Sequence, residues 1–145
     1  MTTKEYLSQA YRLDDEINTK LESLERLKSI AEKMTSVNSG MPHGSSDPHS
    51  KEDVLIKIAD MDAEITADID RLVDLKREIT RTINSVDDQT QRIVLYKRYI
   101  NHERWEQIAC DINYDMRQVT RIHGRALQSV GKKTEEITKA WQSVL

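Results

Sequence analysis

Residues 108–122 read IACDINYDMRQVTRI, and the spacing within them predicts a helix, a tight turn and a second helix. A DNA-reading helix-turn-helix needs apolar anchors on both helices and a small residue where the helices cross. It also needs a turn residue that tolerates a positive φ, as asparagine does. The residues in these roles are the anchors Ile108, Ile112, Val119 and Ile122, the small residue Ala109 and the turn residue Asn113.

Any helical hairpin shows regular apolar spacing, so the anchors alone are not specific. Plain helical packing, however, does not require a small residue, an asparagine four positions later and a valine six positions after that. The pattern therefore favours a DNA-binding helix-turn-helix over plain helical packing. Asp115 precedes the second helix, where its carboxylate is expected to cap the first turn.

Residues 87–130 are predicted to form one helix-turn-helix domain around this stretch. The acidic pair Asp87 and Asp88 suits a helix N-terminus, and an apolar run follows over residues 93–100. Trp105 begins the first helix of the motif.

Residues 1–86 are predicted to form a long helical hairpin of two amphipathic helices. Apolar residues recur there in alternating steps of four and three, and charged residues fill the other faces. We refer to these apolar positions as the seam. They are Tyr6, Ala10, Leu13, Ile17, Leu24, Leu27, Ala31 and Met34 in the first run, and Val54, Ile58, Met61, Ile65, Leu72, Leu75, Ile79 and Val86 in the second.

The two runs are separated by a predicted loop over residues 36–50, which contains both prolines of the chain. Proline cannot continue a helix, so the runs should fold back as an antiparallel pair. Lys20 interrupts the first seam, and Asp68 and Thr82 interrupt the second. If the loop closes symmetrically, Lys20 and Asp68 fall in neighbouring layers and should interact to fix the register.

An isolated two-helix hairpin buries little surface, so it needs a further partner. That partner is either the C-terminal module or a second hairpin, and the sequence leaves both open, including a homodimer through the hairpin. Residues 131–145 form a short amphipathic tail, which we expect to dock on the hairpin in preference to contacting another protein. The fold class is all-α.

The charge is distributed unevenly. The chain of 145 residues has a net charge of −3, but residues 1–86 hold −5 and residues 87–145 hold +2. The stretch from Met116 to Lys133 contains five basic residues and no acidic one. Such asymmetry is a hint of nucleic-acid contact, although a solvated helix face gives the same pattern.

The remaining composition favours a cytoplasmic protein. No stretch approaches the roughly 20 apolar residues of a membrane span, and no signal pattern opens the chain. The single cysteine, Cys110, fits a reducing compartment. No catalytic constellation, cofactor site or metal site is predicted, so we do not expect an enzyme. The four histidines, His43, His49, His102 and His123, are isolated from other ligands.

Three pieces of the chain carry a resemblance to a known group. They are Arg92-x2-Leu95-x2-Arg98-Tyr99, Trp105-Glu106-Gln107-Ile108-Ala109 and Val119-x2-Ile122-x3-Ala126-Leu127. This segment resembles region 4 of sigma-70-type factors, and more closely the phage-encoded sigma-like regulators of the ArpU and RinA type. The N-terminal hairpin is similar to that of a phage family of sigma-like proteins with unassigned function.

The resemblance implies that the final helix enters the major groove of a promoter. It places the base-reading positions on Met116, Arg117 and Arg121. It places Gln118, Thr120 and Arg125 near the DNA backbone or beside RNA polymerase. Met116 departs from the family, which often has arginine there, so the family's sequence preference does not carry over.

The side-chain chemistry divides the basic residues in two. Arg117 and Arg121 are four residues apart, face one side of a helix and can each form a bidentate pair with guanine. Phosphate contacts, which position without reading sequence, are expected from Arg98, Arg104, Lys132 and Lys133.

The motif and the resemblance together imply a sequence-specific regulator of phage or prophage transcription that binds double-stranded promoter or operator DNA. The resemblance alone implies that it acts with host RNA polymerase, in the cytoplasm of a bacterial host and associated with the nucleoid. Two alternatives remain. One is a DNA-packaging protein of the small-terminase type, although those proteins usually place the DNA-binding element before the oligomerisation helices. The other is a helical protein-interaction module that does not bind DNA.

Overall fold

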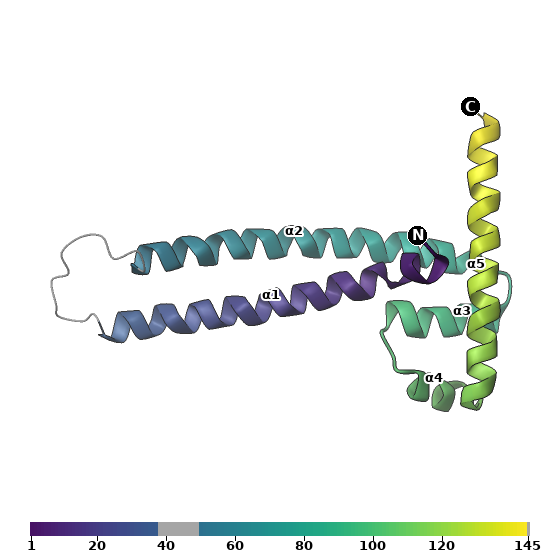
Figure 1. Ribbon diagram of the computed structural model, residues 1–145, viewed down its shortest axis with the longest axis horizontal. Coiled ribbons are helices and arrows are strands. Elements are labelled where there is room, and N and C mark those ends of the chain that lie inside the picture. Colours follow the sequence, from purple (N-terminus) through teal and green to yellow (C-terminus); the bar gives the residue numbers. More distant parts are fainter. Residues whose placement is uncertain (38–49, 145) are drawn as a thin grey trace. The chain divides into compact units, whose positions relative to one another are not determined.

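The computed structural model describes residues 1–37 and 50–144, and this part of the chain is helical with no strand. The all-α prediction is confirmed. The elements are α1 (Thr3–Val37), α2 (Lys51–Asn84), α3 (Gln89–Leu95), a π-helical turn η1 (Tyr96–Ile100), α4 (Trp105–Ile112) and α5 (Met116–Val144) (Figure 1). Helix α1 extends to Val37, past the start of the predicted loop at residue 36. Residues 38–49 of that loop, with His43 and His49, lie outside the described residues.

The chain divides into two compact units. The first, which we call the hairpin unit, is Leu13–Arg71. The second, which we call the C-terminal unit, combines Met1–Arg12 with Leu72–Leu145. The sequence analysis placed one boundary at residue 86 instead. The difference arises because the ends of α1 and α2 share a core with α3 and α5, which only the tertiary structure reveals.

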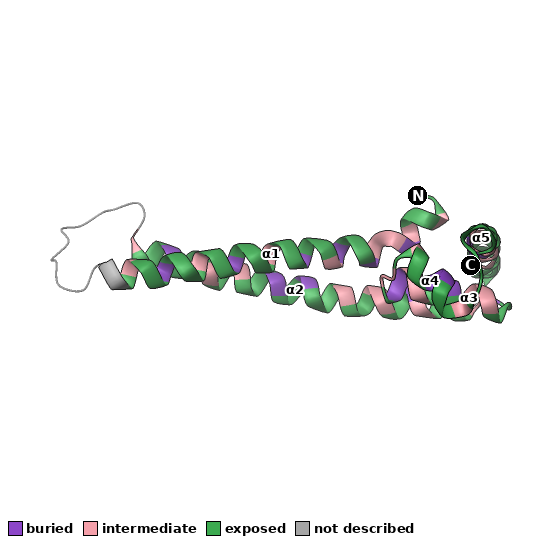
Figure 2. Cartoon of the chain, turned by 90° about the horizontal axis from the view of Figure 1, so that it is seen from below, coloured by how far each residue is buried: buried purple, intermediate pink, exposed green. Residues whose placement is uncertain are grey.

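In the hairpin unit, α1 and α2 run antiparallel and side by side (Figures 1 and 2). Their buried apolar side chains all come from seam positions, so the heptad pattern identifies the contact surface of each helix. These side chains are Leu13, Ile17, Leu24, Ala31, Val54 and Ile65. Ile69, one position after Asp68 and outside the seam, is exposed.

Lys20 and Asp68 meet at the centre of the hairpin unit. The ammonium group of Lys20 donates to Oδ2 of Asp68 at 2.6 Å and to Oε1 of Glu64 at 2.9 Å. The hydrogen bond from Lys20 lowers the pKa of Asp68, and the same bond raises the pKa of Lys20. The Asp68 side chain is 8% exposed, whereas that of Glu64 is 60% exposed, so Asp68 depends far more on this partner.

The main core of the C-terminal unit lies where the first turns of α1 and the end of α2 meet α3, η1 and α5. Leu7, which the seam pattern omitted, is fully buried there beside the seam residue Ala10. A second side of α1 is covered at this point, so the apolar stripe is wider than in the hairpin unit. The other buried members of this core are Ile79, Ile83, Val86, Leu95, Tyr99, Ile100, Ala126 and Val130.

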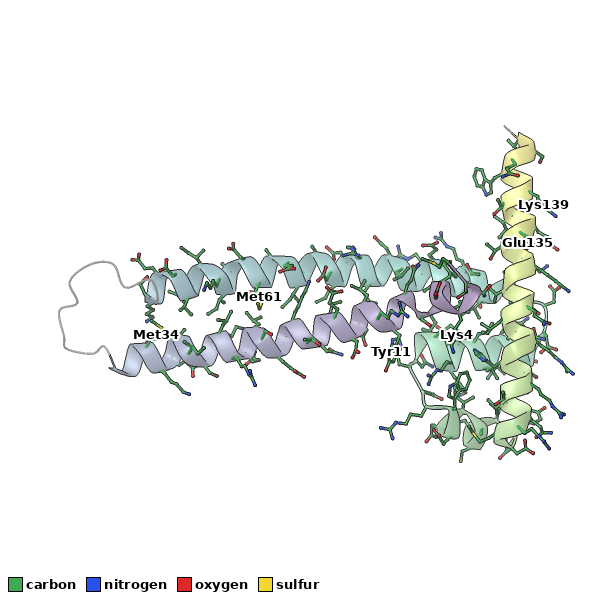
Figure 3. All side chains as sticks on the ribbon, viewed as in Figure 1. Lys4, Tyr11, Met34, Met61, Glu135 and Lys139 are labelled. Carbon is green, nitrogen blue, oxygen red and sulfur yellow. The ribbon has the colours of Figure 1, made fainter. Side chains whose placement is uncertain are left out.

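Helix α5 is continuous from Met116 to Val144, so residues 131–144 continue the same helix. Gly131 lies where α5 passes the start of α1, since a Cβ atom there would be 3.4 Å from Oγ1 of Thr3. Beyond it, Ile137, Trp141 and Val144 are 49%, 70% and 82% exposed. Figure 3 labels Glu135 and Lys139 on this exposed half of α5. The predicted docking of the tail on the hairpin stays a prediction.

Among the described residues, no helix is both long enough and apolar enough to cross a membrane.

The Lys20–Asp68 pair gives a direct test of the hairpin register. Asp68→Ala should lower the melting temperature more than Glu64→Ala, because Asp68 is buried and its removal leaves Lys20 with only exposed acceptors. The double-mutant cycle consists of the wild type, Lys20→Ala, Asp68→Ala and the Lys20→Ala/Asp68→Ala double variant, each measured by thermal unfolding. Glu64→Ala is measured beside them for comparison. Additive effects of Lys20→Ala and Asp68→Ala would contradict a specific pair.

Candidate nucleic-acid interface

Helices α4 and α5 pack on each other and on α3 around a small second core. Ile108 and Val119 are fully buried in it, with Val94 of α3 between the two helices and the small residue Ala109 at the crossing. Ile112, Ile122 and Trp105 pack around the edge. All four predicted anchors and the small residue thus belong to one core, which fixes α5 against α4.

Asn113 forms the turn between these helices. Its backbone has φ 58° and ψ 39°, which is the left-handed conformation that the sequence analysis assigned to it. The N–H of Tyr114 then donates to the carbonyl of Ala109 at 3.1 Å, and that of Asn113 donates to the carbonyl of Cys110 at 3.4 Å. These bonds satisfy the last carbonyls of α4, so the chain can leave that helix and begin α5 within three residues.

The first turn of α5 is capped on both sides. The N–H of Gln118 donates to Oδ1 of Asp115 at 2.8 Å, and the N–H of Asp115 donates to Oε1 of Gln118 at 3.2 Å. This reciprocal arrangement is a capping box, which satisfies two backbone donors that a helix start otherwise leaves open. Gln118 therefore already has a role within the fold, in addition to the backbone contact that the resemblance implies.

The exposed side of α5 near its start is basic. Arg117, Arg121 and Arg125 recur at intervals of four, so their side chains leave the helix on one side, and all three are exposed. Within the described part of the chain, none of the three guanidinium groups forms an ion pair. We call these three residues the arginine face. Met116 and Thr120 are also exposed beside it.

Other basic residues of the C-terminal unit are held by the protein itself. Nη1 of Arg98 donates to the carbonyl of Glu103 at 3.0 Å, and the Arg98 guanidinium lies 4.6 Å from the centre of the Trp105 ring. Lys133 pairs with Asp87 at 3.6 Å and Glu136 at 3.7 Å. Both side chains thus have partners within the protein, and the phosphate contacts expected of them from the sequence stay predictions. Arg104 and Lys132 are exposed.

His123 of α5, to which the sequence assigned no role, contacts both η1 and α4. Its Nε2 is 2.6 Å from the hydroxyl of Tyr99 on η1, and its ring meets that of Trp105 on α4 edge to face, with centroids 4.5 Å apart. Burial lowers the pKa of His123 to about 4, and the nearby charges of Lys4 and Arg98 act in the same direction. Burial also raises the pKa of Tyr99 to about 12, so both groups are uncharged at neutral pH.

Gly124 follows His123 on the exposed side of α5. Helix α5 continues past this residue to Val144. No part of the described chain comes close to it, since a Cβ atom on Gly124 would meet nothing within 4 Å. Glycine costs about 1 kcal/mol relative to alanine inside a helix, and no contact within the fold offsets this cost.

A comparison with known proteins identifies the family to which this chain belongs. A family model described as a protein of unknown function (DUF1492) matches residues 32–130, which is more than half of the chain. The chain therefore belongs to the DUF1492 family. The matched region contains α2, α3, α4, the Asn113 turn and the arginine face. No curated protein and no solved structure matches the chain.

The low pKa of His123 predicts a specific dependence of stability on pH. Between pH 6.5 and about 4, His123 takes up a proton in the unfolded chain but stays neutral in the folded one. Stability from this residue is therefore complete above pH 6.5 and is lost as the pH falls toward 4. Urea unfolding at pH 7 and pH 5 should show a smaller decrease for His123→Gln than for the wild type. Equal decreases would contradict a buried neutral histidine.

Proposed function

We propose that this chain is a sequence-specific DNA-binding regulator of transcription that reads the major groove with the first half of α5. The observation that carries the proposal is the arginine face, whose three exposed guanidinium groups have no acidic partner among the described residues. Unpaired basic side chains on one helix face suit a polyanion, and arginine suits guanine in particular.

The rigidity of the helix supports the same proposal. Base readout requires that side chains be held in a fixed position relative to the duplex, and sites on packed helices are more precise than sites on loops. The Asn113 turn, the capping box at Asp115 and the core around Ile108 and Val119 together hold the start of α5. Arg117 and Arg121 are the proposed base readers, with Met116 beside them for apolar contact with a thymine methyl group.

Arg104, Lys132, Thr120 and Arg125 are the proposed contacts to the DNA backbone. We leave Arg98 and Lys133 out of this set, because the fold already uses their charges. Because the proposed interface has only the arginine face, Arg104 and Lys132 as basic side chains, one copy of the chain should bind DNA only modestly. Stable binding then requires a second copy or a protein partner. Host RNA polymerase is such a partner by resemblance to sigma region 4, and promoters of phage or prophage genes are the corresponding targets.

The hairpin unit is the proposed surface for a second copy. It exposes several large apolar side chains away from the seam, which a homodimer would cover. These are Leu21, Ile30, Leu55, Ile56 and Ile69. A monomer or dimer in solution scattering agrees with a regulator, whereas a ring-like assembly would favour the packaging protein.

The exposed end of α5 favours a second candidate function, a protein-interaction module that does not bind DNA. Ile137, Trp141 and Val144 are the apolar side chains that such a module would present to a partner. The two candidates differ in a simple observation: a protein-interaction module does not bind any duplex at low salt.

The division between reading and positioning residues predicts different effects of two substitutions. Arg121→Ala should relax sequence preference, with a loss of about 1–3 kcal/mol on the preferred duplex and little change on random DNA. Lys132→Ala should weaken binding to all sequences alike and reduce the salt dependence by about one counterion. Fluorescence anisotropy with labelled duplexes at several salt concentrations measures both effects.

Lys133→Ala is the matched control, because Lys133 neighbours Lys132 but is already paired with Asp87 and Glu136. It should change binding much less than Lys132→Ala. Equal losses for Arg121→Ala on preferred and random duplexes would contradict base reading by this helix.

A further inference from the structure

Within the described part of the chain, neither a close contact nor a positive φ requires a glycine at position 124. Two reasons usually require glycine, a positive φ or a close neighbour. Gly124 lies within the regular helix α5, and a Cβ atom there would meet nothing within 4 Å in the described part of the chain. Gly131, the other glycine of this helix, does have a neighbour, because its Cβ position is 3.4 Å from Oγ1 of Thr3.

The position of Gly124 relates it to the arginine face. It lies three residues after Arg121 and seven after Arg117, which places it on the same side of α5 one helical turn further on. Gln128, four residues later, is exposed on this side as well. The bare backbone of Gly124 therefore interrupts a row of long polar side chains, and it faces solvent in the free protein.

We infer that Gly124 is a point of close approach between α5 and bound DNA, where the sugar–phosphate backbone at the groove wall lies against the helix. This inference rests on the proposed function and adds a steric determinant to it. A helix with its side chains is about 10–12 Å across, and the major groove is about 12 Å wide, so little space remains at the walls. A residue without a side chain lets the helix enter deeply enough for Arg117 and Arg121 to reach base edges.

The substitution Gly124→Ala tests this directly, because its effects on the free protein and on the complex have opposite signs. In the free protein alanine meets no obstacle and favours the helix, so the melting temperature should rise by about 2–5 °C. In the complex the added methyl group occupies the space of the DNA, so affinity for the preferred duplex should fall at least about tenfold. Gly124→Leu, with a larger side chain, should lose more.

Gly131→Ala is the matched control, since it adds the same methyl group to the same helix at a position that faces Thr3. Its affinity for the duplex should equal that of the wild type. Differential scanning fluorimetry and fluorescence anisotropy on the same samples give both quantities, with Arg121→Ala measured in parallel.

The outcomes distinguish a failure of the close approach at Gly124 from a failure of the proposed DNA-binding function. If Gly124→Ala is more stable and binds as tightly as the wild type, while Arg121→Ala loses affinity, the close approach is wrong and the DNA-reading function stands. If the wild type binds no duplex at low salt, both the function and this inference are overturned. A rise in stability together with a loss of affinity that grows from alanine to leucine supports the inference.

Discussion

The left-handed backbone of Asn113 is the constraint on which the proposed interface depends. It ends α4, and the bonds from Asn113 and Tyr114 back to α4 leave only a short connection before α5 begins. The direction of α5 then follows from the packing of Ile108 against Val119, and the capping box at Asp115 fixes its first turn. A residue with a branched Cβ at Asn113 would strain this turn and, through it, shift every side chain of the arginine face.

The contacts of His123 hold α5 in place on a second side of the helix. Its ring contacts Tyr99 on η1 and Trp105 on α4, while Arg98 lies over the Trp105 ring. Because burial keeps His123 uncharged at neutral pH, its imidazole adds no positive charge beneath the arginine face. Arg98 and Lys133 also have partners within the protein, whereas the three side chains of the arginine face are exposed and unpaired among the described residues. The overall charge of −3 does not reveal this basic face.

The parts of this structure that sequence reasoning predicted depend on local spacing. The anchors, the Asn113 turn and the Asp115 cap are separated by few residues, so a short pattern specifies each of them. The seam and the Lys20–Asp68 contact follow from heptads in two helices that a proline-containing segment separates. In each case the residues that the sequence pattern selects are the residues that make the observed contact.

The parts that sequence reasoning missed depend on contacts between distant segments. Leu7 is buried because α1 meets the end of α2 and α5 at that point, and His123 finds a partner in Tyr99, 24 positions before it. The continuation of α5 past Gly131 was missed because the pattern predicted a short amphipathic tail over residues 131–145. The contacts of Arg98 with Glu103 and Trp105 were not apparent from the sequence either.

Selection of bound duplexes from a random DNA pool tests the central claim most directly, because it assumes no target. The full chain should enrich a discrete motif, both alone and with RNA polymerase present. The Arg117→Ala/Arg121→Ala double variant, shown by its melting temperature to be folded, should lose that motif. No enrichment by the wild type at low salt, or the same motif from the double variant, would contradict the account.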